Sequence, residues 1–183
     1  MPTAMPTAMP NATPTPPSPA GTTGPAGGQF LTFQLGSGLY ALDIASVREI
    51  IQLAPMTAMP LMPPFVRGVI NLRGAVVPVI DLHARLGHAP SVPGRKSCIV
   101  LVELHRTGER LALGLLVDAV SAVVDLPAAA LEPPPDFGAP VQRSFIRAVG
   151  CAAQRFVVVL APETAFDVDE MARLCETAVA ATA

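Results

Sequence analysis

The chain is poor in charge and in aromatic side chains, and it contains no tryptophan. Charged residues make up 14% of the 183 residues, aromatic residues 4%, and the net charge is −2. Nucleic-acid binding relies on clustered Lys and Arg for the phosphates, and often on aromatic rings that stack on bases. Because the sequence has no basic block and few rings, we expect no nucleic-acid partner.

The chain also lacks paired cysteines and long apolar runs. Its three cysteines, Cys98, Cys151 and Cys175, are widely spaced and form no CxxC motif. This spacing predicts buried free thiols in a reducing compartment. Pro, Gly or a charge interrupts every apolar stretch before it could span a membrane, and the first residues lack the basic start of a signal peptide. We therefore expect a cytoplasmic protein without direct membrane insertion.

Residues 1–28 have a composition typical of disorder. They contain no charge, no aromatic residue and no Val or Ile, and proline recurs every few positions. Such a segment cannot bury enough surface to offset the entropy lost on ordering. We predict a disordered tail, with the folded part starting at Gln29.

From residue 29 onward, alternating apolar residues and turn signals predict about ten short strands, as in all-β barrels. Residues 29–44 read as a hairpin, with Leu31, Phe33 and Leu35 on one face of its first strand and Thr32 and Gln34 on the other. Residues 110–126 read as one or two strands kinked near Asp118, residues 127–141 as a loop, and residues 144–161 as a second hairpin. The chain then ends in a predicted helix, capped by Asp167 with Glu170 in a capping box.

The stretch "FVRGVINLRGAVVPVIDLHARLG" (65–87) has an arginine, glycines and a proline inside apolar runs. Residues 71–74 match a type I turn, which places Arg73 at a hairpin tip. Pro78 cannot donate a backbone hydrogen bond, so we expect it at an edge, a bulge or a barrel corner. Asp81 and Gly87 are expected to begin and end a short helix.

The sequence contains no recognisable catalytic or metal-binding arrangement. No nucleophile motif and no phosphate-binding glycine loop is present. His83 and His88 near Asp81 are too few for a metal site, and we expect a solvated loop there. We therefore predict no enzyme activity, no catalytic residue, no metal and no cofactor.

The region from residue 29 to about 175 resembles the CheW-like domains of chemotaxis coupling proteins. The resemblance is carried by the 65–87 stretch, by "FLTFQLGSGLYALDIASVREII" and by "LALGLLVDAVSAVVDL". It implies two five-stranded SH3-like barrels around a shared core, with a C-terminal helix. It also implies a CheW-like domain over 29–178, with a boundary between the barrels near 85–97.

The resemblance further implies a non-catalytic adaptor that links methyl-accepting chemoreceptors to the regulatory domain of the histidine kinase CheA. Val47 and Glu49 match the V-x-E-I element of the family, and Gly68 and Arg73 match its G-V-x-N-L-R-G element. Both elements are tied to receptor binding in the family. Such a protein would act in the cytoplasm at membrane-associated chemoreceptor arrays.

Val117, Asp118 and Val120 match a segment of the second half, and the sequence assigns them only weakly to a partner interface. From chemistry alone, Glu49 and Arg73 form either an exposed pair of little energetic value or a charged feature on an apolar contact surface. An alternative function is a CheW-like module of a related chemosensory pathway that does not control swimming. A kinase fragment or a receiver-containing relative does not fit within 183 residues.

Overall fold

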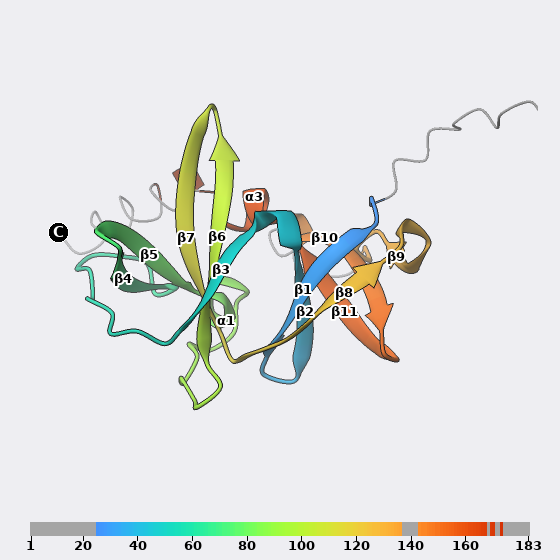
Figure 1. The fold of residues 1–183 in the computed structure, drawn as a ribbon, viewed down its shortest axis with the longest axis horizontal. Helices are drawn as coiled ribbons and strands as arrows, with labels where there is room; N and C mark the ends of the chain where they lie inside the picture. Colours follow the sequence, from blue (N-terminus) through green and yellow to red (C-terminus); the bar gives the residue numbers. More distant parts are fainter. Residues whose placement is uncertain (1–24, 137–142, 168, 171–172, 174–183) are drawn as a thin grey trace, which may run out of the picture.

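The computed structural model describes residues 25–136, 143–167, 169–170 and 173. In this part of the chain, eleven strands form two antiparallel-rich sheets, which lie on the left and the right of Figure 1. The five-stranded sheet has the order β3-β6-β7-β5-β4, and the six-stranded sheet has the order β8-β1-β2-β11-β10-β9. The predicted all-β, two-barrel class is confirmed.

The five-stranded sheet comes from one continuous segment of the chain. Its strands are β3 (Val47–Gln52), β4 (Val66–Leu72), β5 (Ala75–Asp81), β6 (Cys98–Arg106) and β7 (Glu109–Val117). The six-stranded sheet combines both ends of the described chain: β1 (Gly28–Leu35), β2 (Gly38–Asp43), β8 (Ala119–Leu126), β9 (Leu131–Glu132), β10 (Ile146–Ala152) and β11 (Arg155–Leu160). Short helices add η1 (Ile44–Ser46), α1 (Leu82–Arg85), η2 (Ala128–Ala130) and α3 (Pro162–Ala165).

Three details differ from the sequence predictions. The second sheet has six strands because β9, together with η2, lies in the segment predicted as a loop. The segment 85–97 does not separate the sheets, since β5 and β6 on either side of it belong to the same sheet. The fold also begins slightly before Gln29: Gly28 pairs with Leu126, and the Ala26 carbonyl accepts a hydrogen bond from Arg147.

The two sheets repeat one arrangement. In each sheet, the second strand of an antiparallel hairpin also pairs in parallel with a further strand. These strands are β5 of the β4–β5 hairpin, which pairs with β7, and β11 of the β10–β11 hairpin, which pairs with β2. Residues 65–82 and 145–162 correspond position by position, with Phe65 and Phe145 before the hairpins and a register shift at the start of each. Asp81 N–H donates to the Phe65 carbonyl, as Ala161 N–H donates to the Phe145 carbonyl.

Apolar side chains form three clusters rather than one. One cluster fills the five-stranded barrel and includes Ile70, Val79 and Leu116; another fills the six-stranded barrel around Phe30, Ala148 and Val159. The largest lies between the barrels and takes residues from both sheets. Strands facing this shared cluster are buried on both sides, which is why Thr32, on the polar face of β1, is buried as well.

Thr32 is buried and bonded across the sheet. Its hydroxyl donates to the Ala122 carbonyl at 2.8 Å and accepts from the Ala122 N–H at 3.2 Å. A register shift in the β1–β8 ladder follows Thr32. The hydroxyl thus replaces ladder hydrogen bonds that the shift would leave unmade.

Arg85 lies where the two barrels and the end of the chain meet. Its guanidinium carbon is 4.8 Å from the ring centroid of Phe65 and 4.5 Å from that of Phe145. Its Nε donates to the Ala165 carbonyl at 2.7 Å, and Nη2 pairs with Glu170 at 2.8 Å. One buried arginine therefore connects corresponding phenylalanines of the two barrels to the C-terminal segment.

The 65–87 stretch forms the predicted hairpin and helix. The turn itself is not type I: Arg73 and Gly74 both have positive φ, 53° and 86°, as in a type I′ turn. The reason is the two-residue connection, whose twist matches that of the flanking strands. Pro78 precedes the parallel ladder between β5 and β7, which runs over residues 79–81, so its missing N–H interrupts no bond there.

Helix α1 is capped at both ends as predicted. The Asp81 carboxylate accepts from the N–H groups of His83 and Ala84. At the other end, Gly87 has φ of 84°, and His88 N–H donates to the His83 carbonyl in a Schellman motif. Asp167 caps the next segment by accepting from the N–H groups of Asp169 and Glu170, but the rest of the predicted C-terminal helix lies outside the described residues.

The cysteines differ from the prediction at one position. Cys98 is half-buried, and Cys151 is exposed on β10; Cys175 lies outside the described residues, as do residues 1–24 of the predicted tail. Among the described helices, none is both long and apolar enough to cross a membrane.

Candidate functional site

The residues predicted to bind a receptor lie along the two edge strands of the five-stranded sheet. The Arg73 Nη2 is 3.0 Å from Glu49 Oε1, so this ion pair joins the start of the β4–β5 turn to β3. Residues 53–65 run between these strands. We call residues 47–76 the seam; they comprise β3, this connecting segment, β4, and the turn that leads into β5. The pairing predicted from sequence is thus present in the structure.

Arg73 is positioned by the turn that carries it. Asn71 Oδ1 accepts the Gly74 N–H at 2.9 Å, which fixes the backbone on both sides of the arginine. The side chain of Arg73 is 73% exposed, whereas that of Glu49 is 34% exposed. Glu49 therefore holds the guanidinium against the sheet while most of Arg73 stays available to a partner.

Gly68 has a structural reason to be glycine. Its φ is 144°, and an added Cβ would lie 2.3 Å from the carbonyl oxygen of Thr57. Thr57 and Val69 exchange two backbone hydrogen bonds, each 2.9 Å long. Gly68 thus lets the connecting segment lie directly on β4, and it contributes to the seam through backbone packing rather than through a side chain.

Val47 lies at the start of β3 and is partly buried. It packs against the cluster between the barrels, two residues before Glu49. The ladder between β3 and β6 shifts register between Val47 and Glu49. The four predicted receptor-binding residues therefore share the seam, and two of them, Glu49 and Arg73, are paired through their side chains.

The seam exposes unusually many large apolar side chains. Nine such side chains are exposed in the described part of the chain, and six of them lie on β3, the connecting segment or β5: Ile50, Leu53, Met59, Leu61, Met62 and Val76. Exposed apolar side chains that gather in one segment of a small protein are typical of an interaction site. Methionine and arginine are also enriched in the centres of protein interfaces.

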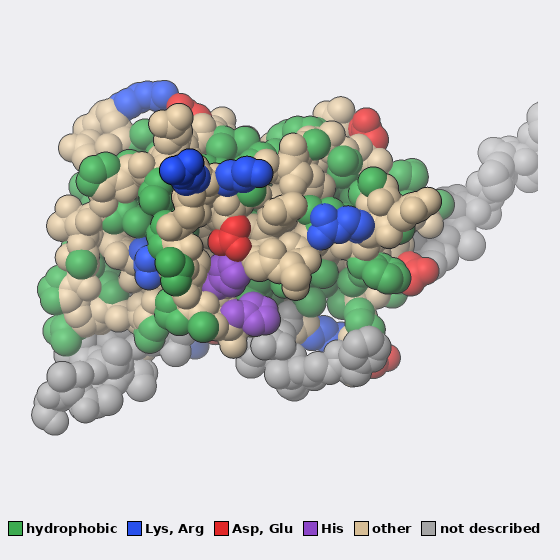
Figure 2. Space-filling model, turned by 90° about the horizontal axis from the view of Figure 1, so that it is seen from below, with side chains coloured by type: hydrophobic (Ala, Val, Ile, Leu, Met, Phe, Trp, Pro, Cys, Tyr) green, Lys and Arg blue, Asp and Glu red, His purple; other side chains and the backbone are tan. Residues whose placement is uncertain are grey.

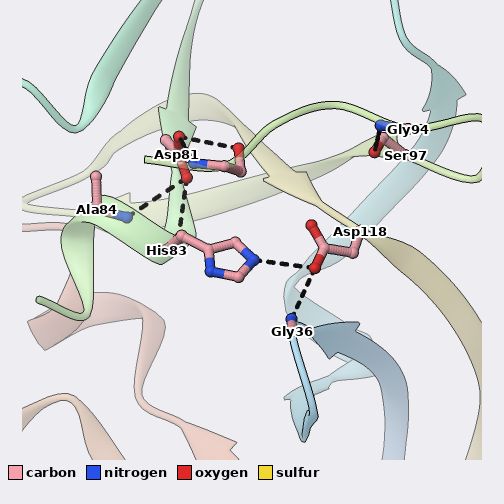
Figure 3. A network of polar contacts seen from close by, with 8 residues as sticks. Gly36, Asp81, His83, Ala84, Gly94, Ser97 and Asp118 are labelled. Atoms are coloured by element: carbon pink, nitrogen blue, oxygen red, sulfur yellow. Dashed lines mark hydrogen bonds and ion pairs between the residues drawn. The ribbon is translucent and has the colours of Figure 1, made fainter. Parts of the chain in front are cut away.

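The second predicted group, Val117, Asp118 and Val120, lies where the chain passes from one sheet to the other. Val117 is buried between the barrels, and Val120 packs against the same cluster. Asp118 Oδ2 accepts the Gly36 N–H at 2.7 Å and lies 3.0 Å from His83 Nε2 (Figure 3). In the structure these residues connect the barrels: Val117 is buried, whereas Asp118 and Val120 are partly buried.

Asp81 extends this network into the loop that follows α1. It is fully buried, and its Oδ2 accepts from both the N–H and the hydroxyl of Ser91, at 2.8 and 2.9 Å (Figure 3). These bonds compensate the loss of water around the carboxylate. The solvated loop expected after the capped helix is present, since residues 87–90 and 92–96 are exposed. Ser91 is the exception, because its bonds to Asp81 bury it.

The polar groups of the site do not form a metal centre. Among the described residues, no group of three or more His, Cys, Asp or Glu side chains is placed to hold an ion.

Burial raises the pKa of Cys98, and a hydrogen bond from the Val120 backbone partly opposes this rise. A thiol with a raised pKa is a poor nucleophile at neutral pH.

Comparison with known proteins agrees with this architecture. The family model described as "CheW-like domain" matches residues 29–170. The chain belongs to the CheW-like family. Proteins of this family act as scaffolds that couple receptors to the kinase CheA in chemotaxis.

Individual relatives cover most of the chain. It is 37% identical over 142 residues to the "Probable chemotaxis protein CheW" of Rhizobium etli, covering 78% of this chain and 89% of the relative. It is 35% identical over 144 residues to the "Chemotaxis protein CheW" of Rhizobium meliloti, covering 79% and 90%. The crystal structure of the scaffolding protein TtCheW from Thermoanaerobacter tengcongensis matches with a TM-score of 0.68 and 32% identity, covering 77% and 93%.

Proposed function

We propose that this chain is a non-catalytic adaptor that binds the cytoplasmic tip of a chemoreceptor and the regulatory domain of CheA. Its membership of the CheW-like family supports this role, and the exposed apolar seam around Arg73 is the observation that carries it. The adaptor works at chemoreceptor arrays next to the membrane. It needs no cofactor, because its task is to hold two proteins together.

The receptor contacts the seam through Val47, Glu49, Gly68 and Arg73. Arg73 supplies a rigid, planar group that binds carboxylates and stacks on flat surfaces. Glu49 holds this group in place, and Gly68 keeps the connecting segment close to β4. Exposed methionines beside them adapt their shape to a partner at low energetic cost.

The kinase domain contacts a different surface, so that both partners bind at once. The second barrel offers one at Phe156, which is 80% exposed. Phe156 occupies the position in β11 that corresponds to Val76 in β5, the strand after Arg73. Each barrel thus presents an exposed apolar side chain next to its hairpin, as a bivalent adaptor requires.

Substitution of Arg73 tests the receptor-binding role. Arg73→Glu and Arg73→His should remain folded, because an exposed ion pair adds about 1 kcal/mol or less to stability. Both variants should bind a purified receptor signalling fragment at least about tenfold more weakly, since interface arginines often contribute more than 1.4 kcal/mol. Binding of the CheA regulatory domain should be affected less.

Arg143→Glu is the matched control. The side chain of Arg143 is also exposed, at 52%, and also pairs with a carboxylate, that of Asp136, but it lies just before β10 in the other barrel. The exchange Glu49→Arg with Arg73→Glu should restore part of the lost affinity. Normal receptor affinity in the Arg73 variants would show that Arg73 does not contact the receptor. If the effects of the Glu49 and Arg73 substitutions on affinity simply add in a double-mutant cycle, the ion pair plays no part in binding.

Titration with both partners tests the bridging role. The receptor fragment and the kinase domain are added separately and then together to the purified chain. A ternary complex is expected, and complete displacement of one partner by the other would contradict bridging by a single copy. Binding to receptors or kinases of a pathway that does not control swimming would favour the alternative of a related chemosensory module.

A further inference from the structure

We propose that the loop between α1 and β6, residues 88–97, is a docking site for an acidic peptide segment that also carries apolar side chains. This contact is separate from the seam and from Phe156, and it would add a further partner to the adaptor. In Figure 1 the loop projects at the bottom of the molecule, whereas β4 and β5 lie at the left and β11 at the right.

Two adjacent cations at the tip of this loop lack partners. Arg95 and Lys96 are both exposed, and neither makes a hydrogen bond or ion pair with the described part of the chain. Other arginines differ: Arg48 and Arg110 share Glu103, Arg73 pairs with Glu49, and Arg147 pairs with Asp43. In a chain with so few charges, two neighbouring uncompensated cations create a local positive potential.

The loop is held firmly at both ends. Ser91 is buried and bonded twice to the buried Asp81 carboxylate. At the other end, Ser97 is buried, its hydroxyl accepts the Gly94 N–H at 2.8 Å, and its N–H donates to the Gly94 carbonyl. The residues between these anchors, 92–96, are all exposed. A preorganised loop loses little conformational entropy when a partner binds.

A hollow of about 500 Å³ adjoins the two cations. Pro90 and Val92 contribute apolar surface to it, and Val92 is 90% exposed. Asp118 also lines the hollow, but its Oδ2 is already engaged by the Gly36 N–H and by His83. Figure 2 views the molecule from this side and shows Lys and Arg side chains close to acidic and His side chains.

These features select the chemistry of the partner. Uncompensated Arg95 and Lys96 require carboxylates, and the exposed Val92 beside them favours an apolar side chain next to those carboxylates. A peptide that alternates acidic and apolar residues provides both. Two cations beside a hollow form a compact site, whereas binding to an anionic membrane surface uses larger basic clusters.

The test uses the full chain and a fluorescein-labelled peptide that alternates Glu with Leu, followed by fluorescence anisotropy. We expect saturable binding that weakens with added salt, and much weaker binding of the same peptide with Gln in place of Glu. Arg95→Gln with Lys96→Gln should lower the affinity about tenfold, which corresponds to about 1.4 kcal/mol. Val92→Ser should lower it as well.

The control removes the same charge elsewhere. Arg110→Gln with Arg155→Gln also removes two cations, so it lowers the net charge equally, from −2 to −4, and it should leave the affinity within about twofold. Lys96 is the only lysine of the chain, so a carbodiimide that joins carboxylates to amines should couple the peptide to this residue. Mass spectrometry locates the bond.

Three results would overturn the proposal. They are the absence of saturable peptide binding, an equal loss of affinity in both double variants, and coupling only at the N-terminal amine. Binding to vesicles that contain anionic lipid, without binding to the peptide, would assign the cations to a membrane surface instead. None of these measurements uses the receptor or CheA, so their outcome is independent of the proposed adaptor function.

Discussion

Replacing Gly68 with alanine should detach the connecting segment from β4. The added Cβ would lie 2.3 Å from the Thr57 carbonyl oxygen and 2.9 Å from the carbonyl carbon, both of which are backbone atoms. A side chain could rotate away from such a contact, but backbone can relieve it only by moving. The two hydrogen bonds between Thr57 and Val69 are therefore expected to break.

The size of the effect follows from two contributions. Each backbone hydrogen bond adds about 0.5–1.5 kcal/mol net, so the loss of two costs about 1–3 kcal/mol. An alanine at a positive φ adds about 1–2 kcal/mol of backbone strain. We expect Gly68→Ala to lower the free energy of unfolding by about 2–5 kcal/mol, while the three apolar clusters keep the chain folded.

Substitutions of two other glycines distinguish the effect of the steric clash from that of backbone strain. Gly74 has a φ of 86°, but an added Cβ would meet nothing within 4 Å, so Gly74→Ala should cost only about 1–2 kcal/mol. Gly28 has neither a positive φ nor a close neighbour, and Gly28→Ala should have little effect on stability.

Urea unfolding measures the free energies, and limited proteolysis monitors cleavage within residues 53–65. Gly68→Ala should expose this segment to protease, whereas the two control variants should not. If Gly68→Ala is as stable as Gly74→Ala and its connecting segment stays protected, the close approach of Thr57 does not explain the glycine. A loss of receptor binding with the segment still protected would instead indicate that the receptor approaches Gly68 directly.

Two further changes test the junction and the thiols. Arg85→Lys should lower the free energy of unfolding in urea by about 2–3 kcal/mol, because lysine cannot stack on Phe65 and Phe145 while keeping both polar contacts; an unchanged stability would contradict the role of the guanidinium. Alkylation by iodoacetamide, mapped by mass spectrometry, should modify the exposed Cys151 faster than Cys98, whose raised pKa leaves less thiolate at a given pH. Equal rates would contradict this difference.

Local patterns in the sequence predicted local structure well. The hairpin around Arg73, the caps of α1, and the pair of strands that meet near Asp118 all depend on neighbouring residues, and the structure confirms them. The Glu49–Arg73 pair was also predicted, because two charges in an apolar region have few alternatives. The turn type was wrong, since the strands on either side impose a twist that the four residues alone do not reveal.

Features that depend on distant residues were missed. The alternation in β1 places Thr32 opposite its apolar neighbours, but it does not show that this face of the strand is buried as well. Asp81 looked like a simple helix cap, and nothing nearby indicates its bonds to Ser91. Arg85 gave no signal, because its partners are far from it in the sequence: Phe65, Phe145, Ala165 and Glu170.

One signal was present but not used. Residues 65–69 read F-V-R-G-V, and residues 145–149 read F-I-R-A-V. The structure places these segments at corresponding positions of the two barrels, which explains their similarity. Comparing the chain with itself would have indicated the internal repeat before any coordinates were known.

The five-stranded barrel is inserted, as a whole, between β2 and β8 of the other barrel. The chain crosses between the barrels twice, after Asp43 and at Asp118, and each crossing takes only a few residues. Apolar side chains fill the space between the barrels. Two short connections limit bending between the barrels more strongly than a single flexible linker would. Proteins bound to opposite barrels would therefore be held at a fixed angle. A rotation of one bound protein would then rotate the other, because the two barrels move together.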